Sequence, residues 1–515
     1  MNLNRRNFLL GSAAATALAG CATSKVGVRQ LKPGEKPTVA IIGYGLRARD
    51  LTGEFLGLTD MCRVTAVCDC DKVRLAAGVK RVNDFYAKKG IRNACKGYAD
   101  FREVIANPDI DMVCIATPDH WHAYMSVEAM KHGKDVYCEK PLTFCVDESK
   151  KVMAAQKKYD RVFQTGSMQR CWPEFRTAVM IVRNGFIGDV KYVDANYGIG
   201  GEKLGGPSHP IRFYDEPEKA ATEGAPNPDV DWNMWLGPAK WRPYSDRFAP
   251  RGMHKGYSQV MFWRFDDDIG TGYNGDWGAH HLDIAQWGLD MDKSGPYRII
   301  CSDEPHSDNL FHGGRRQFGM KMLFKKPYGD VELYHGPFGV LTGRGGWGTV
   351  FYGTKGIVAV NRGKIAVWLG QGVKPTLEIR KQLEGMTFNG MELVAASVGK
   401  DYGTDASSKK DNKLDAALKK LNERFKLDTA KVQVYKSTDK SQVRNFVEHY
   451  FDRKPTQSPA ETGGRSAILC QLCNMSYVYD TGFDWDPEKN DFAGESKLGI
   501  SLKREVYRNG WEVVV

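Results

Sequence analysis

The chain has little excess of either charge and few aromatic residues where its lysines are densest. Its formal net charge is +11 over 515 residues, and the lysines concentrate between Lys400 and Lys440. A nucleic-acid-binding face combines a stronger basic patch with aromatic side chains that stack on bases. We therefore expect a solvated surface there and no nucleic-acid partner. With 42% hydrophobic and 26% charged residues the chain resembles a soluble globular protein, and its length favours two domains.

A second cysteine or histidine pair that would complete a zinc site is also missing. Cys470 and Cys473 have metal-ligand spacing, but no such pair accompanies them. We expect both to lie in the core of a helix, and we expect no metal. Cys68, Cys114 and Cys138 fall within apolar, strand-like runs and read as small buried hydrophobic residues.

The N-terminus carries a sorting signal and too few apolar residues for a permanent membrane span. Arg5 and Arg6 form a twin-arginine pattern, and an alanine-rich segment leads to a lipobox-like motif ending in Cys21. We expect residues 1–20 to be a signal peptide and residues 21–36 a linker. The protein would then be exported to the periplasm, with a lipidated Cys21 as its sole membrane attachment. The alternative is a cytoplasmic protein, and twelve cysteines are unusual for an oxidising compartment.

A dinucleotide-binding pattern follows the first strand-like run at residues 37–42. It reads Gly43-Tyr44-Gly45-Leu46-Arg47-Ala48, a G-x-G-x-x-A motif that opens a helix. Such glycines permit a tight turn and close approach of the backbone to a diphosphate at the helix N-terminus. A second strand at residues 63–68 ends in Asp69, whose carboxylate would bind the ribose hydroxyls and favour NAD over NADP. Lys72 and Arg74 nearby leave NADP possible.

Strand and helix signals alternate through the rest of residues 37–166. Within residues 110–142 we expect a strand, a helix and a second strand that delivers Glu139-Lys140-Pro141 to the carboxyl edge of the sheet. These elements are expected at residues 112–116, 120–131 and 135–138, followed by a helix at 147–158 and a strand at 162–166. The alternation predicts an α/β domain with a doubly wound parallel sheet, whose carboxyl edge binds ligands.

Residues 167–515 read as a second, α+β domain. After a helix near residues 175–184, strand-like runs follow without long helices between them, at residues 188–197, 297–301, 317–324, 329–334, 349–352 and 356–360. That pattern predicts a large, mostly antiparallel sheet. We interpret residues 231–244 as an ordered loop, residues 409–425 as an amphipathic surface helix, residues 444–477 as one or two late helices, and residues 484–515 as a polar tail with aromatic anchors.

Asp276 and His280 form the informative pair of the second half. Their spacing places both on one face of a helix if the helical turn begins at Asp276. A carboxylate beside an imidazole can orient its tautomer and raise its basicity, as a general base requires. The structural alternative is that Asp276 caps a helix and His280 only packs.

Taken in order, these motifs resemble the glucose-fructose oxidoreductase/inositol dehydrogenase/MocA (Gfo/Idh/MocA) family. The resemblance rests on the glycine turn at Gly43, the A-T-P-D-H-W-H run at Ala116, the E-K-P at Glu139 and the D-x-x-x-H at Asp276. It implies a Rossmann domain and a C-terminal sheet domain that bears the substrate site and often an oligomer interface. It also implies catalytic roles for Lys140, Asp276 and His280, with Thr117, Pro118, His122 and Glu139 at the cofactor.

The resemblance implies an NAD(P)-dependent oxidoreductase that acts on a CH–OH group of a sugar or cyclitol. An NAD-dependent glycosidase or lyase working through a transient keto-sugar is the alternative, and a non-catalytic sugar-binding lipoprotein is a third reading. Lys140 favours net redox chemistry, because the best-known glycosidases of this fold replace the lysine of E-K-P. We also expect a homo-oligomer. Candidate substrate contacts in the second domain are Arg170, Tyr197, Arg264 and His281.

Overall fold

The computed structural model describes most of the chain after residue 28. The described residues are 29–197, 226–254, 262–266, 268–272, 274–310, 316–335, 347–398, 412–479, 481–494 and 501–515. The twin-arginine motif and Cys21 therefore lie outside the described residues. Within these ranges, no helix combines the length and the hydropathy that crossing a membrane takes.

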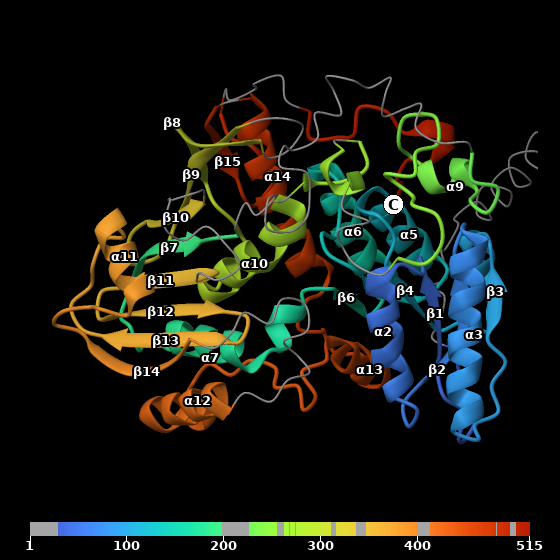
Figure 1. The fold of residues 1–515 in the computed structure, drawn as a ribbon, viewed down its shortest axis with the longest axis horizontal. Helices are drawn as coiled ribbons and strands as arrows, with labels where there is room; N and C mark the ends of the chain where they lie inside the picture. The colour runs from blue at the N-terminus through green and yellow to red at the C-terminus, as the bar shows by residue number, and fades with distance from the viewer. Residues whose placement is uncertain are drawn as a thin grey trace, which may run out of the picture.

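Six parallel strands form the first sheet, in the order β3-β2-β1-β4-β5-β6 (Figure 1). The order reverses between β1 and β4, so a crevice opens beyond the carboxyl ends of these two strands. The doubly wound parallel sheet predicted from the sequence is confirmed. Its strands are β1 Thr38–Ile42, β2 Arg63–Cys68, β3 Lys96–Tyr98, β4 Met112–Ile115, β5 Asp135–Cys138 and β6 Phe163–Thr165; its helices are α2 Leu46–Gly57, α3 Lys72–Lys88, α4 Phe101–Ala106, α5 Asp119–Lys131 and α6 Val146–Tyr159.

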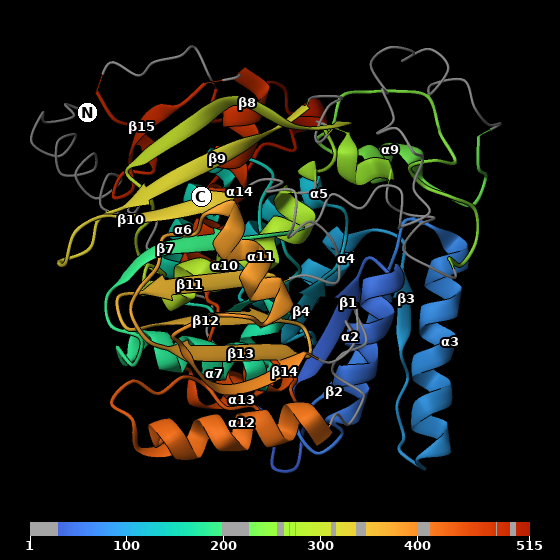
Figure 2. The same cartoon turned by 60° about the vertical axis from the view of Figure 1, so that its left-hand side comes forward.

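The second sheet has the order β14-β13-β12-β11-β7-β10-β9-β8-β15-β16 and faces the viewer in Figure 2. Strand β7 pairs parallel with β10, and the other neighbours pair antiparallel, which confirms the mostly antiparallel sheet. The strands are β7 Val190–Ala195, β8 Arg298–Leu310, β9 Arg316–Phe324, β10 Val331–His335, β11 Thr349–Gly353, β12 Gly356–Asn361, β13 Lys364–Leu369, β14 Glu392–Val398, β15 Phe483–Asp486 and β16 Asp491–Phe492.

Two expectations for the second domain need correction. The sequence reading missed strands β13 to β16, of which β15 and β16 lie at the start of the expected polar tail, and it assigned residues 231–244 to a loop. A short helix, α9 (Trp232–Leu236), lies in that segment, because the Asp231 side chain accepts a hydrogen bond from the backbone N–H of Met234 and caps it. Burial of Leu236 holds the helix against its neighbours.

Three helices pack against the second sheet (Figure 1): α7 (Pro173–Arg183), α10 (Ala279–Gly288) and α14 (Ala460–Tyr479). Helix α14 packs on both α6 and β6. Its close approach depends on Gly463, where a Cβ atom would lie 1.9 Å from Oγ1 of Thr165. Gly463 therefore lets α14 of the second domain pack closely against the first sheet.

The C-terminal segment returns to the nucleotide-binding half of the molecule. Helix α13 (Gln442–Asp452) places Val443 and Phe446 in the same apolar core as β1, and the late helices predicted from the sequence are confirmed. Near the end of the chain, Trp511 and Val513 pack in the core on the other side of the first sheet. The two domains therefore share apolar cores, although the first domain ends near residue 166 of the chain.

Candidate active site

A cavity of about 600 Å³ is lined by the carboxyl edge of the first sheet and by the second domain. The first sheet contributes Gly43, Gly45, Leu46, Arg47, Asp69, Thr117, Pro118, Glu139 and Lys140. The later part of the chain contributes Trp235, Arg264, Asp276, Trp277, His280 and Arg362. Among the residues that the sequence singled out for catalysis or cofactor binding, Tyr44 and His122 do not line it.

The glycine turn after β1 has the shape that a dinucleotide needs. Gly43 has a φ of +82°, and a Cβ atom there would lie 2.9 Å from Cγ2 of Thr117. Gly45 precedes the first turn of α2, its position is open to the cavity, and no side chain caps the helix. The N–H groups of that turn are therefore available to a phosphate group, which is the arrangement that binds a diphosphate in this type of sheet.

Asp69 lies at the end of β2 and lines the same cavity. Its Oδ2 accepts a hydrogen bond from the backbone N–H of Tyr44 at 2.6 Å, and its Oδ1 accepts one from the N–H of Asp71 at 2.8 Å. Burial raises the pKa of Asp69, while Arg74 and these two hydrogen bonds act in the opposite direction. Each carboxylate oxygen accepts more than one hydrogen bond, so the group can still receive ribose hydroxyls.

Arg47 and Glu139 form an ion pair across the carboxyl ends of β1 and β5. Nε of Arg47 donates to Oε1 of Glu139 at 2.8 Å, and the hydroxyl of Tyr137 donates to the same oxygen at 3.3 Å. The backbone N–H of Lys140 donates to Oε2. Glu139 is therefore held from three sides, and these contacts place the following residue, Lys140, at the cavity.

Lys140 reaches across the cavity to Asp276. Its Nζ lies 2.7 Å from Oδ1 of Asp276 and 2.9 Å from the backbone oxygen of the same residue, while Nε of Arg264 lies 3.4 Å from Oδ1. Burial alone would raise the pKa of Asp276, but the two cations hold it well below its ordinary value. The carboxylate is therefore ionised and neutralises both cations in part.

The expected pairing of Asp276 with His280 is not what the structure shows. Residues Asn274–Gly278 form a π-helical turn, and the regular helix α10 begins only at Ala279. That wider turn changes the spacing on which the prediction depended. The Asp276 carboxylate consequently faces Lys140 and Arg264 instead of the imidazole.

His280 lies in the first turn of α10 and lines the cavity. Its Nδ1 is enclosed and has no hydrogen-bond partner among the described residues. Burial, with the charges of Arg362 and Lys140, lowers the pKa of His280 well below its ordinary value. The imidazole is therefore neutral near pH 7 and able to accept a proton.

His122 has a structural position instead of the expected cofactor contact. It is buried, and its two ring nitrogens lie 2.9 Å from the backbone oxygen of Thr117 and 2.7 Å from that of Pro141. These carbonyls belong to the loops that follow β4 and β5. His122 thus joins the two loops whose neighbouring residues, Pro118 and Lys140, form the cavity wall.

Of the four candidate substrate contacts, Arg264 lines the cavity and the other three do not. Arg170 is fully buried in ion pairs with Asp283 and Asp292. The hydroxyl of Tyr197 donates to Oδ1 of Asn274, and His281 is buried beside Trp277 on α10. The sequence could not show this, because the partners of Arg170 lie more than a hundred residues further along the chain.

Arg362 is one of the cavity residues that sequence reasoning missed. It lies in the turn between β12 and β13, and its side chain is buried. Its Nε donates to Oε1 of Gln169 at 2.8 Å, and its guanidinium lies over the rings of Trp172 and Trp277. The sequence shows a polar turn after a strand-like run at this position. Nothing in that local pattern indicates that the turn lies at the same cavity as Lys140.

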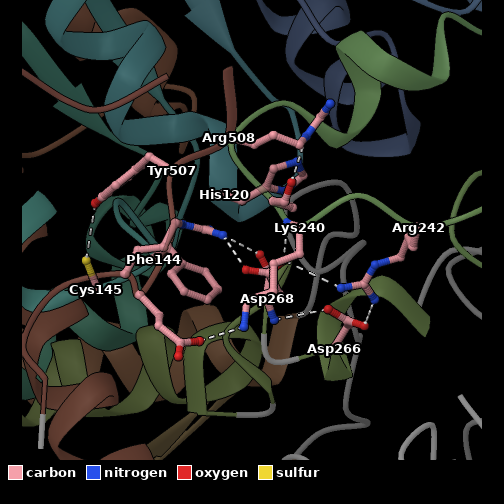
Figure 3. Close-up of polar contacts among 12 residues, drawn as sticks. His120, Phe144, Cys145, Lys240, Arg242, Asp266, Asp268, Tyr507 and Arg508 are labelled. Carbon is pink, nitrogen blue, oxygen red and sulfur yellow. Dashed lines mark hydrogen bonds and ion pairs between the residues drawn. The ribbon is translucent and has the colours of Figure 1, made fainter. Parts of the chain in front are cut away.

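The C-terminal segment holds one wall of the cavity in place (Figure 3). Helix α9 supplies Trp235 to the lining, and the segment that follows it supplies Phe248. Nε of Arg508 donates to the backbone oxygen of Ala239, and Nζ of Lys240 lies 2.6 Å from Oε2 of Glu505. These contacts tie the wall to the end of the chain.

Asp268 provides a second, more buried connection in the same region (Figure 3). Its Oδ1 accepts from Arg504 at 2.7 Å, and its Oδ2 accepts from the backbone N–H of Lys240. The guanidinium of Arg504 also lies 4.0 Å from the centre of the Phe144 ring. The segments near residues 240, 268 and 504 are therefore held together on the first domain.

Metal ligands are not gathered anywhere in the described part of the chain. No group of three or more His, Cys, Asp or Glu residues there could hold a metal ion. Cys470 and Cys473 are buried free thiols within α14, in the apolar core of the second domain, as the sequence reading predicted.

Comparison with known proteins gives a family match in each of the two domains. Residues 38–167 match the Gfo/Idh/MocA model described as an oxidoreductase-family NAD-binding Rossmann fold, and residues 212–320 match the C-terminal α/β domain of the same family. A glycosyl hydrolase family 109 protein of Shewanella sp. strain ANA-3 is 34% identical over 161 residues, 28% of this chain and 35% of that protein. Inositol 2-dehydrogenase 1 of Mycolicibacterium vanbaalenii is 31% identical over 155 residues, 29% of this chain and 41% of that enzyme.

These matches span less than half the length of either relative, whereas the structural likeness extends over nearly the whole chain. The WlbA dehydrogenase of Bordetella pertussis, solved with NADH and UDP-GlcNAcA, superposes with a TM-score of 0.54. It is 13% identical, and the match covers 88% of this chain and 99% of that one, so the two proteins share a fold. Residues 38–167 and 212–320 thus match the two domains of the Gfo/Idh/MocA family of oxidoreductases, and the first of these domains is an NAD-binding Rossmann domain.

Proposed function

We propose that the protein is an NAD-dependent oxidoreductase that acts on a CH–OH group of a sugar or cyclitol. The observation that carries this proposal is the convergence of Lys140, Asp276 and His280, from two domains, on the cavity that also contains the Gly43–Gly45 turn. The partial match to an inositol 2-dehydrogenase supports the same substrate class.

Each residue of the trio has a distinct role in the proposed reaction. Bound NAD supplies the hydride acceptor. Lys140 donates a hydrogen bond to the reacting hydroxyl and favours its alkoxide character, and Asp276 holds the lysine in position. His280, neutral because of its buried position, takes the hydroxyl proton. Because its Nδ1 is enclosed, Nε2 is the nitrogen that would accept that proton.

Asp69 favours NAD over NADP in this proposal. Its carboxylate lies at the cavity, where it would receive ribose hydroxyls and repel a 2′-phosphate. Arg74 approaches Asp71 at 3.4 Å and also contacts His254, so its guanidinium is already engaged beside the site. Both features weigh against binding of the 2′-phosphate of NADP.

A glycosidase or lyase cycle with a retained cofactor is the second candidate. The match to a glycosyl hydrolase family 109 protein favours it, although that match covers about a third of the relative. The retained Lys140 supports net redox chemistry instead. Release of free aglycone from an aryl glycoside without net NADH would identify the glycosidase cycle.

We further propose that the protein is exported by the twin-arginine route and anchored in the periplasm through a lipidated Cys21. The Arg5-Arg6 pair and the lipobox-like end of the alanine-rich segment support this. A homo-oligomer is also proposed, from the family resemblance. Cell fractionation of wild type and C21A, with size-exclusion chromatography of the purified protein, tests both points.

The function is tested by identifying the bound nucleotide and following turnover. Mass spectrometry of the supernatant from denatured protein should identify NAD, and a panel of sugars and cyclitols should give absorbance at 340 nm. Protein that binds no nicotinamide nucleotide and oxidises no sugar in the panel would contradict the proposal.

A further inference from the structure

A buried glutamine connects the proposed base to the β12–β13 turn. Gln169 lies in the short 3₁₀ turn η1 (Met168–Cys171), which follows β6 where the chain leaves the first sheet. Its Nε2 donates to the backbone oxygen of His280 at 3.2 Å, and its Oε1 accepts from Nε of Arg362 at 2.8 Å. Both partners line the cavity, whereas Gln169 does not. This side chain can therefore act on the reaction only through the residues that it holds.

The two contacts of Gln169 require an amide. A backbone oxygen can only accept a hydrogen bond, and Nε of an arginine can only donate one. The amide NH₂ group must therefore face His280, and the amide oxygen must face Arg362. A glutamate of the same length could serve the arginine but not the backbone oxygen, and a methionine could serve neither. The chemistry of the side chain matters here as well as its size.

The neighbours of Gln169 in the chain hold the same two elements. Nη2 of Arg170 lies 2.7 Å from Oδ1 of Asp283 on α10, and the ion pair is buried. The ring centre of Trp172 lies 5.4 Å from the guanidinium of Arg362. The position of η1 against α10 is thus fixed by an ion pair, and the arginine rests on an aromatic ring from the same segment. Gln169 is consequently held in place between its two partners.

The charge of His280 depends on groups from several elements. Four side chains oppose its protonation, and burial acts in the same direction; in order of decreasing effect they are Arg362, Lys140, His281 and Arg47. The carboxylate of Asp276 pairs with Lys140 and Arg264 instead of the imidazole. Because the interaction between charges falls with distance, the position at which Arg362 is held bears directly on the basicity of His280.

We propose that Gln169 is a positioning residue, whose amide fixes the Arg362 guanidinium against the first turn of α10 and thereby keeps the imidazole of His280 neutral and in place. The part of this inference that concerns turnover rests on the proposed function. The state of the imidazole in the folded protein does not, so the two can be tested separately.

Titration of His280 by NMR tests the inference without turnover. Protein with isotope-labelled histidine is studied between pH 8 and pH 5, and the His280 signal is the one that H280N lacks. The variant Q169E has the size of the wild-type side chain and places a carboxylate beside Arg362 and the imidazole. We expect the protonation midpoint of His280 to rise by about one pH unit or more, because a nearby negative charge favours the imidazolium.

A matched glutamine elsewhere controls for the added charge. Gln433 is exposed, and its amide also donates to backbone oxygens, those of Leu427 and Ala430. Q433E should leave the His280 signals as in wild type. Should Q169E fail to fold, R362K takes its place, because a lysine has no Nε–H for Gln169 to hold and the charge moves. His280 signals with the same pH dependence in wild type and in the folded variant would overturn the inference.

A double-mutant cycle tests the part that concerns turnover. Q169M removes both contacts of the amide, and we expect kcat for sugar oxidation to fall about tenfold or more, since the base and the arginine are displaced. KM should stay within about threefold, because Gln169 does not line the cavity. If Gln169 acts through Arg362, Q169M/R362K loses little more than the slower single variant. Losses in kcat that multiply would contradict this.

The outcomes separate this inference from the proposed function. If no sugar in the panel is oxidised, the proposed function fails, and the titration of His280 in Q169E still decides whether the amide governs the imidazole. If wild-type protein oxidises a sugar while Q169M keeps the wild-type kcat and Q169E keeps the wild-type titration, the proposed function stands and the inference fails.

Discussion

The ammonium nitrogen of Lys140 lies 2.7 Å from Oδ1 of Asp276, although 136 positions separate the two residues in the chain. One follows the fifth strand of the nucleotide-binding sheet, and the other lies in the π-helical turn before α10. This ion pair joins the two domains at the cavity, beside the imidazole of His280. The proposed chemistry depends on it, because it fixes the lysine that would contact the reacting hydroxyl.

Replacing Lys140 by methionine should lower kcat by about 10²–10³-fold, because it removes a preorganised donor to the developing alkoxide. The change also leaves Asp276 with Arg264 as its remaining cationic partner among those described above. Steady-state oxidation at 340 nm measures the effect. K150M, at a more exposed lysine of α6, is the matched control and should keep the wild-type rate. A K140M rate within threefold of wild type would remove the lysine from the mechanism.

The pH dependence of sugar oxidation should reflect the depressed pKa of His280. Its pKa lies well below 6.5, since burial and the nearby cations disfavour the charged form. The imidazole therefore remains neutral as the pH falls from 8 to 6, and kcat/KM should be constant over that range. H280N should lose at least about 10²-fold in kcat at every pH. An acid limb centred near pH 6.5 in the wild-type profile would show that the base is a solvated group elsewhere.

Two glycines of the nucleotide turn should respond differently to substitution. G43A places a side chain at a φ of +82° and 2.9 Å from Thr117, so the free energy of unfolding should fall by about 1–2 kcal/mol. At Gly45 no atom lies within 4 Å of the added Cβ, so G45V should alter stability by less than about 1 kcal/mol. It should nevertheless weaken NAD binding at least tenfold, because the new side chain enters the cavity. Denaturant titration and calorimetry with NAD measure the two effects; normal NAD affinity in G45V would place the diphosphate elsewhere.

The folded protein should lose stability as the pH falls below 6.5, in part through His281. Burial lowers the pKa of His281 to about 3, so the unfolded chain binds a proton there before the folded chain does. Stability from this group is complete above pH 6.5 and declines as the pH falls towards 3, by about 2 kcal/mol between pH 7 and pH 5. H281Q should show a correspondingly smaller loss over that interval. H132Q, at an exposed histidine, should follow the wild-type curve, and an H281Q curve parallel to wild type would contradict the assignment.

Much of the nucleotide-binding half could be predicted because its signals are local. The apolar run Met112–Ile115 predicts its own burial in β4. The glycines after β1 likewise predict the tight turn in which they lie. Strand β13 and the return of Phe446 to the first domain could not be predicted in the same way. Their positions depend on which distant surface receives them, and no local period records that choice.

The site was predictable as a set of residues and much less so as a set of contacts. Lys140, Asp276 and His280 line one cavity, but their pairing depends on a π-helical turn that the four-residue spacing conceals. Arg170 appeared equally suited to bind substrate, yet its two aspartate partners make it structural. Arg362 carried no motif at all, and only the folded sheet brings it to the cavity.

Hydride transfer itself is the most direct test of the account. A sugar that the panel shows to be oxidised is prepared with deuterium at the reacting carbinol carbon and given to NAD-loaded protein, and the nucleotide is recovered for mass spectrometry. The account predicts reduced nucleotide heavier by one deuterium, with a primary isotope effect on a single turnover. Consumption of the labelled sugar without deuterium in the nucleotide at any stage of the turnover would contradict it.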